Sequence, residues 1–396
     1  MNEPLLPRNG TGDSQLGTVD GCWSGPWNGQ QPLPDSFVTL PWQIYADDSH
    51  WIPESSAQLR AQFSKDNPWL QQHQAWLGVV PEQARLAGFF RHDERVDGKA
   101  VAFFGFMESI EDGTALRELF QQLARWARDQ GAQHLYGPIN FTTYGMNRLR
   151  LDQFDAMPFP GEPYNPPWYP ALIESVGCTL RYRYATRIAR SLAGVQEDVQ
   201  VQYAPLRSKL ADKLTFSSLS ATRWMDSLPQ LYQLIEQIFG DNFAYTPIDY
   251  QSFVSNCGLP FAERFCPHSS VIASTASGDI AGFFLAFPDY GPLLVQGCEQ
   301  RLQADQIRYS QHQQLLPTPR LLLAKTGGVH PQWRQHGLFT ALSCELTLRA
   351  GDHYQQIAGA LVRDDNQSMQ FAARHGSEAR HYGLFCYDLA RHGQWQ

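Results

Sequence analysis

One stretch indicates the fold, Val329-His330-Pro331-Gln332-Trp333-Arg334-Gln335-His336-Gly337-Leu338-Phe339, because it joins a predicted strand to a predicted helix. A strand that turns directly into a helix leaves several backbone N–H groups without intrahelical partners, and the helix dipole adds positive potential there. Gly337 would let the backbone approach a phosphate closely, and Arg334 supplies a fixed positive charge. The stretch therefore predicts a pyrophosphate-binding site.

The same residues resemble the pyrophosphate loop of the GNAT superfamily of N-acyltransferases, R-x-x-G-x-[GA] after a V-x-P strand end. Arg334 and Gly337 match this pattern, whereas Phe339 stands where the family has Gly or Ala. Asn366 opens the next predicted helix, where the family often has an Asn near the pantetheine arm. The resemblance implies acetyl-CoA or another acyl-CoA as co-substrate, bound by Val329, Arg334, Gln335, His336, Gly337, Leu338, Phe339 and Asn366.

Length and composition set limits on the class of protein. A chain of 396 residues favours two domains, and 43% hydrophobic with 18% charged residues is typical of globular proteins. A net charge of −8 without a Lys/Arg block argues against nucleic-acid partners. Seven widely spaced cysteines indicate neither disulfides nor a metal site, and no apolar run is long enough for a membrane span. We therefore expect a cytoplasmic protein without metal or membrane partner; its oligomeric state is not indicated.

The order of predicted elements divides the chain into two similar halves. Residues 1–35 are rich in Gly, Pro, Asn and Gln and predict a flexible arm, although Trp23 and Trp27 suggest that part of it packs on the protein. Strands and helices alternate over residues 36–190, the polar residues 191–212 predict a linker, and a second cycle covers residues 213–396. This repetition predicts an α/β (α+β) fold of two GNAT-like mixed-sheet domains in tandem.

The first half differs at the position that matches the loop. Its comparable strand continues into Ile110-Glu111-Asp112-Gly113-Thr114, where acidic residues replace the arginine. Carboxylates at a helix start cap the helix and compete with a phosphate. We therefore expect the first half to be a degenerate copy that does not hold CoA.

Two aromatic and amide-rich motifs of the first half, at residues 137–142 and 164–169, resemble segments of large bacterial GNAT-like proteins of unassigned substrate. Clefts between domains commonly hold ligands, so these motifs are candidates for an acceptor cleft between the halves. The alternative is a Pro-rich crossing that packs its own aromatic side chains. The predicted substrate-binding residues are Asn140, Tyr164, Asn165, Trp168 and Tyr169.

The resemblance implies transfer of an acetyl or longer acyl group from CoA to a small-molecule amine. His330 is the candidate base because its intrinsic pKa is near neutral and it follows the strand, although a turn-capping histidine fits equally well. Tyr382 is a candidate acid, since the family's usual tyrosine position holds Ala372. A non-catalytic acyl-CoA sensor or scaffold is one alternative. The other is a Fem-type ligase using aminoacyl-tRNA, which the acidic charge balance disfavours.

Overall fold

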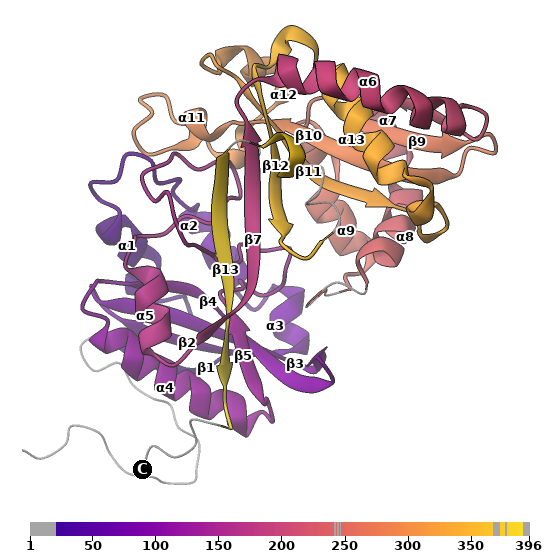
Figure 1. Ribbon diagram of the computed structural model, residues 1–396. Coiled ribbons are helices and arrows are strands. Elements are labelled where there is room, and N and C mark those ends of the chain that lie inside the picture. The colour runs from indigo at the N-terminus through magenta and orange to yellow at the C-terminus, as the bar shows by residue number, and fades with distance from the viewer. Residues whose placement is uncertain are drawn as a thin grey trace, which may run out of the picture.

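A computed structural model describes residues 21–240, 243, 245, 247–366, 373–376 and 378–390. Within these residues a single mixed sheet of thirteen strands runs through the molecule, in the order β1-β2-β3-β4-β5-β13-β7-β12-β11-β10-β9-β8, with β6 paired to β13. Helices cover both faces of the sheet, and the two halves of the chain lie at its two ends (Figure 1).

The first half contributes the strands β1 to β7 and the helices that surround them. Its elements are β1(Trp23–Trp27), α1(Asp35–Ile44), α2(Ser56–Gln62), α3(Pro68–Gln72), β2(Gln74–Val80), β3(Ala84–Val96), β4(Lys99–Ser109), α4(Thr114–Asp129), β5(His134–Gly137), β6(Leu149–Arg150), α5(Tyr169–Ser175) and β7(Thr179–Ala189). The buried residues of α4 and α5 share one core on one face of the sheet. Those of α1, α2 and α3 share another.

The second half repeats this succession after a long helix. Its elements are α6(Leu192–Ala211), β8(Leu214–Ser218), α7(Ala221–Asp226), α8(Leu228–Phe239), α9(Tyr250–Cys257), α10(Leu259–Ala262), β9(Val271–Thr275), β10(Ile280–Pro288), α11(Gly291–Leu294), η1(Ala304–Gln306), α12(Tyr309–His312), η2(Gln313–Leu315), β11(Leu321–Val329), η3(Pro331–His336), α13(Leu338–Arg349), η4(Gly351–His353), β12(Gln356–Arg363) and β13(Glu378–Asp388). Helices α6 and α13 pack on one face of the sheet, and α7 to α10 pack on the other.

Two expectations for the segments outside the domains differ from the structure. Residues 191–212, predicted as a linker, form the helix α6, which Ser191 caps by accepting from the Gly194 N–H at 3.2 Å. Its buried residues Val195, Val199 and Tyr203 recur every four residues, as in a helix, but the many polar residues between them make this helical pattern hard to see in the sequence. Within the predicted arm, β1 pairs with β2 and residues 1–20 lie outside the described residues.

The two halves exchange strands in the middle of the sheet. β13, the last strand of the second half, lies between β5 and β7 of the first, and β7 lies between β13 and β12. Both strands pair antiparallel to their neighbours, and in Figure 1 they run side by side between the two ends of the molecule. Each half therefore needs a strand from the other to complete its part of the sheet.

Candidate functional site

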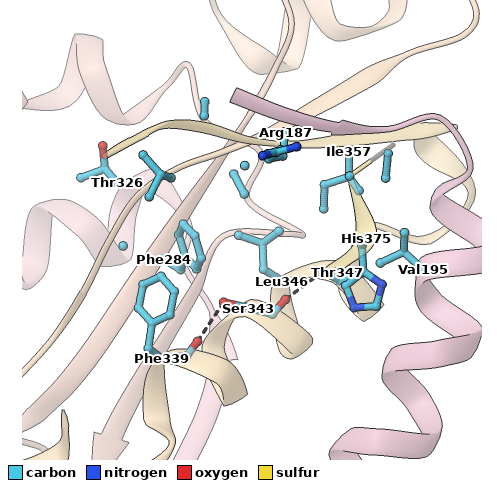
Figure 2. A pocket seen from close by; sticks show the side chains of 17 residues that line it. Arg187, Val195, Phe284, Thr326, Phe339, Ser343, Leu346, Thr347, Ile357 and His375 are labelled. Carbon is cyan, nitrogen blue, oxygen red and sulfur yellow. Dashed lines mark hydrogen bonds between the residues drawn. The ribbon is translucent and has the colours of Figure 1, made fainter. Parts of the chain in front are cut away.

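A cavity of about 120 Å³ opens in the second half between β11, β12 and α13. We call it the β11–β12 cavity; Figure 2 shows its lining side chains converging from these elements and from β7, β10 and α6. It is lined by Arg187, Ala189, Val195, Phe284, Ala324, Thr326, Gly327, Phe339, Ser343, Leu346, Thr347, Ile357, Gly359, Ala360, Val362, His375 and Gly376. Most of these residues are small or apolar, which leaves room for a narrow ligand.

The backbone of the two strands creates this opening. Their parallel ladder pairs Leu321 with Gln356 and ends where Ala324 pairs with Gly359. Beyond that point each strand bulges away from its other neighbour, with Thr326 at φ 70° in β11 and Leu361 at φ 57° in β12. A bulge disrupts the ladder locally and bends its strand. The strands therefore separate, and the edges that face one another past Ala324 have no ladder between them.

The helix face above the opening carries short side chains whose polar atoms are already bonded. The Ser343 hydroxyl donates to the Phe339 carbonyl at 2.9 Å, and the Thr347 hydroxyl donates to the Ser343 carbonyl at 2.8 Å. Phe339 itself lies against Phe284, with ring centroids 5.3 Å apart. These hydroxyls face back to their own helix, so the cavity keeps an apolar wall.

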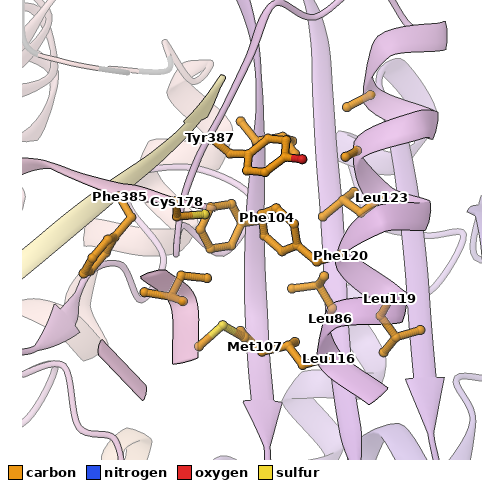
Figure 3. Packing of buried hydrophobic residues seen from close by; sticks show 14 of the residues in the cluster. Leu86, Phe104, Met107, Leu116, Leu119, Phe120, Leu123, Cys178, Phe385 and Tyr387 are labelled. Atoms are coloured by element: carbon orange, nitrogen blue, oxygen red, sulfur yellow. The ribbon is translucent and has the colours of Figure 1, made fainter. Parts of the chain in front are cut away.

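The corresponding layer of the first half is filled. Between α4 and the sheet, Phe120 packs with ring centroids 5.3 Å from Phe104 and 5.2 Å from Tyr387 of β13. Figure 3 shows these rings closing the layer together with Leu116, Cys178 and Phe385. The space that holds a cavity in the second half is hydrophobic core in the first.

Hydrogen bonds also close the first half's strand opening. The ladder between β4 and β5 is followed by the Ile139 N–H donating to the Phe104 carbonyl at 2.7 Å. Next, the side-chain oxygen of Asn140 accepts from the Phe106 N–H at 2.8 Å. Asn140 thus bridges the ends of β4 and β5. In the described part of the second half, no side chain bridges β11 and β12 in this way.

Both helices that follow these strands begin at a left-handed glycine. Gly337 has φ 75° before α13, and Gly113 has φ 66° before α4. A side chain is strained at such a φ, and at Gly337 a Cβ would also lie 3.1 Å from the Leu206 side chain. Neither helix has a side-chain cap, so the expected capping by Glu111 and Asp112 is wrong. The first N–H groups of α13 lie beside Phe339, at the wall of the β11–β12 cavity.

The residues predicted to bind the cofactor are spread around this helix start. Phe339 lines the cavity, while Val329 and Leu338 are buried in the core beneath it. Arg334, Gln335 and His336 are exposed on η3, where one Arg334 Nη donates to the Ile238 carbonyl at 3.4 Å. Asn366 is exposed in the turn after β12, and residues 367–372 of its predicted helix lie outside the described residues. The cavity thus ends near the predicted loop, and Phe339 connects the two.

Neither predicted catalytic residue lines the cavity. His330 caps η3, its Nδ1 accepting from the Gln332 N–H at 3.3 Å. The Tyr382 side chain is fully buried, and its hydroxyl donates to Glu162 and bonds Thr186. Glu162 also bonds Arg150 and Arg380, and Tyr382 therefore belongs to a buried ionic network.

Two ionisable side chains that sequence reasoning did not select line the β11–β12 cavity. His375 lies with its Nδ1 3.9 Å from Asp198 of α6, and burial lowers its pKa below the ordinary value. Arg187 enters from β7, the strand exchanged by the first half. No sequence signal marked Arg187, because its strand reads as an ordinary mix of Arg, Tyr and Ala.

A second, polar cavity of about 340 Å³ lies at the first half's strand ends and is bordered by residues 294–305 of the second. We call it the polar cavity. Residues 296–297 reach the first half directly: the Gln296 N–H donates to the Trp51 carbonyl at 2.7 Å, and the Gly297 N–H to the Ser49 carbonyl at 2.8 Å. Of the predicted substrate-binding residues, Asn140, Tyr164, Asn165 and Tyr169 line this cavity. Trp168 does not; its indole donates to the Ser109 carbonyl at 3.3 Å.

Carboxylates outnumber cations at one end of the polar cavity. The buried Arg85 lies 3.5 Å from Glu54 and 3.7 Å from Glu108. Glu108 also accepts from the hydroxyls of Tyr45 at 3.2 Å and Tyr169 at 2.7 Å. Burial raises the pKa of both glutamates above the ordinary value. A positively charged ligand would stabilise the ionised form of both carboxylates.

One strand separates the two cavities. Ala324 and Thr326 of β11 line the β11–β12 cavity, whereas the Nζ of Lys325 donates to the carbonyl of Pro160, a residue of the polar cavity, at 3.4 Å. Burial lowers the pKa of Lys325 to about 8, and the Arg148 guanidinium contributes to the same shift. The cavities thus approach one another from opposite faces of β11.

Neither a metal cluster nor a membrane span is found in the described part of the chain. No three His, Cys, Asp or Glu side chains among its residues are grouped to hold a metal ion. No described helix is both long and apolar enough to cross a bilayer.

Comparison with solved structures decides the fold. The chain aligns over 95% of its length with a GCN5-related glucosamine N-acetyltransferase region of a fungal multi-domain β-N-acetylglucosaminidase, at a TM-score of 0.50 and 13% identity, covering 39% of that chain. The protein has a tandem GNAT-like fold.

Other similarities are weaker or shorter. A tandem GNAT protein from the clavulanic acid biosynthesis pathway aligns at a TM-score of 0.47 and 12% identity, over 93% of this chain and 98% of that one. Protein YghO of Escherichia coli (strain K12) is 26% identical over 231 residues, which are 56% of this chain and 57% of that protein. The match thus spans little more than half of that relative. No family model matches the sequence.

Proposed function

We propose that the protein is an N-acyltransferase that binds acyl-CoA in the β11–β12 cavity and transfers the acyl group to an amine. The observation that carries this proposal is the open strand pair of the second half, which leads from the helix start at Gly337 into a narrow cavity. The first half has the same succession of elements but a filled layer, so the proposal assigns a single donor site to the chain.

The residues present fit an acyl-CoA at this place. The first N–H groups of α13 and the exposed Arg334 suit a pyrophosphate. Beyond Ala324 the edge of β11 that faces β12 pairs with no described strand, so its backbone groups could bond the amides of a pantetheine arm. The apolar wall of Phe284, Phe339 and Leu346 suits the methylene groups of the arm.

The chemistry needs a base for the amine proton. The amine nitrogen attacks the thioester carbonyl carbon, a C–N bond forms, and the C–S bond breaks as CoA leaves as a thiolate that takes up a proton. In the proposal His375 accepts the proton that the attacking nitrogen loses. Its burial favours the neutral imidazole, which is the form able to accept a proton at neutral pH.

We assign the amine acceptor to the polar cavity. The pair Glu54 and Glu108, with Arg85 as their shared cation, favours a ligand that carries an ammonium group. Tyr45 and Trp51 stack at 4.9 Å beside these carboxylates and offer a flat apolar surface. The acceptor in this proposal is thus a small polyamine or aminated molecule rather than an uncharged one.

Titration calorimetry with CoA and acetyl-CoA tests the donor site, and release of free thiol from acetyl-CoA in the presence of diamines tests transfer. The proposal requires one CoA per chain and thiol release that depends on the amine. Thr347→Trp, which places a large ring in the β11–β12 cavity, should abolish both, whereas Val201→Trp at an exposed residue of α6 should change neither. Full CoA affinity in Thr347→Trp would refute the donor site.

A non-catalytic acyl-CoA-binding protein is a second candidate, because β11 and the Lys325 side chain stand between the two cavities. Transfer requires the acceptor amine to reach the thioester past this strand. Stoichiometric acetyl-CoA binding without thiol release from any amine would favour this second function.

A further inference from the structure

The guanidinium of Arg187 lies in the wall of the β11–β12 cavity and has no partner among the described residues. It makes no salt bridge and no side-chain hydrogen bond to any of the described residues, and its Nε is buried and unbonded. The other lining side chains are uncharged apart from His375, whose burial favours the neutral form. Figure 2 shows the Arg187 side chain above the cavity, opposite Ser343 and Leu346.

An anion bound in the cavity would stabilise the guanidinium of Arg187. The half-buried Arg187 offers a planar fork of N–H donors that matches a carboxylate, and such charge-assisted hydrogen bonds are stronger than neutral ones. The two hydroxyls nearest the helix wall are used by their own backbone carbonyls and do not compete for the same ligand.

The register of the strands places Arg187 away from the pyrophosphate loop. Ala324 pairs with Gly359, and Gly359 pairs with Arg187, so all three lie at the level where the strand opening begins. The loop follows Val329, five residues further along β11, which corresponds to roughly 16 Å at about 3.3 Å per residue. A phosphate bound at the loop is therefore beyond the reach of this side chain, whereas the acyl end of the donor is near it.

We infer that Arg187 binds a carboxylate at the end of the acyl chain, so that the preferred donors are CoA thioesters of dicarboxylic acids. This inference rests on the proposed acyl-CoA site and deepens it by naming the donor class. It also gives the first half a direct part in the second half's chemistry, because Arg187 belongs to the exchanged strand β7.

Calorimetry with succinyl-CoA, butyryl-CoA and free CoA tests the inference, since the first two differ in the terminal carboxylate. The wild-type chain should bind succinyl-CoA about 10- to 100-fold more tightly than butyryl-CoA, the range expected for a charge-assisted hydrogen bond. Arg187→Gln should remove this difference and leave butyryl-CoA and free CoA within about twofold of the wild type. Arg187→Lys, which keeps the charge without the fork, should fall between the two.

Arg183→Gln is the matched control, because Arg183 lies on the same strand and is exposed. Equal weakening of all three ligands by Arg187→Gln would show that the side chain binds a CoA phosphate and would overturn the inference. An unchanged preference in Arg187→Gln would overturn it as well. Absence of binding of all three to the wild-type chain would refute the acyl-CoA site itself, and the inference with it.

Discussion

The two halves have the same order of elements and differ in what lies between the helix and the sheet. In the first half Phe104, Phe120 and Tyr387 interlock under α4, and Asn140 bridges the strand ends. In the second half Ser343 and Thr347 leave the layer under α13 open. The difference teaches that the same order of elements can leave space behind the helix start in one half and fill it with hydrophobic core in the other.

The largest effect is expected from separating the halves. A fragment of residues 205–396 lacks β7 and most of α6, so β12 and β13 lose their shared neighbour and the cavity loses Arg187 and Val195. The fragment should fail to fold and should bind no CoA, as circular dichroism and calorimetry would show. A soluble fragment that binds CoA like the full chain would show that the halves are independent.

Filling the open layer should make the second half resemble the first. Ser343→Phe puts a ring where the cavity is, and overpacking plus loss of space should reduce CoA affinity about 100-fold or more. Val201→Phe, at an exposed residue of α6 outside the cavity, is the control. Fluorescence competition with a labelled CoA measures both variants, and equal affinities would contradict the assignment of the cavity.

The base can be tested through pH. Burial lowers the pKa of His375, so its neutral form persists to more acidic pH than for a free histidine, and kcat should fall only below about pH 6.5. His375→Gln should lower kcat about 100-fold and remove this acid limb, with little change in CoA affinity. An unchanged pH profile in the variant would show that His375 is not the base and would favour His330, the N-cap of η3, in that role.

The filled layer of the first half should matter for stability and not for binding. Phe120→Ala removes a ring that packs against Phe104 and Tyr387, which should cost about 3–5 kcal/mol of unfolding free energy in urea titrations. CoA affinity of the folded variant should stay within about twofold, because Phe120 lies outside the β11–β12 cavity. A large loss of affinity would mean that the two layers are coupled through β13.

The smallest effect is expected from giving the first half a better loop. Asp112→Arg restores a positive charge next to the left-handed Gly113, but the layer behind it stays filled. Calorimetry should still find one CoA per chain. Two bound CoA molecules per chain would show that the first half fails to bind CoA because of the charge at its loop and not because the layer behind the loop is filled.

The sequence predicted the elements that have a strong period and missed those whose role depends on tertiary partners. In α4, for example, the buried residues Leu116, Leu119 and Leu123 recur at the spacing of a helix, so the sequence of this segment is sufficient to indicate it. The few apolar residues of α6 are separated by polar ones, so its amphipathic pattern is weak in the sequence. The exchange of β7 and β13 between the halves cannot be seen in the sequence of either strand. Which strands pair over a long distance depends on how the whole sheet is buried, and the sequence of a single strand does not show this.

For the site, the sequence indicated the region but few of its side chains. Phe339 lines the cavity, and four residues of the two aromatic motifs line the polar cavity, because those motifs lie at strand ends of the first half. Arg187, Ser343 and Thr347 were missed since ordinary strand and helix residues become cavity walls only through packing. Asn140, which the sequence predicts as a substrate residue, lines the polar cavity, and its side-chain oxygen also accepts from the Phe106 N–H of β4.

The exchanged strand has a consequence for how the protein is made. A ribosome releases the first half long before β13 has been synthesised, at about 5–20 residues per second, so β5 and β7 leave the exit tunnel as unpaired neighbours of a missing strand. Exposed strand edges are templates for wrong pairing with other nascent chains. The sheet of the first half can therefore be completed only after β13, almost at the end of the second half, has been synthesised.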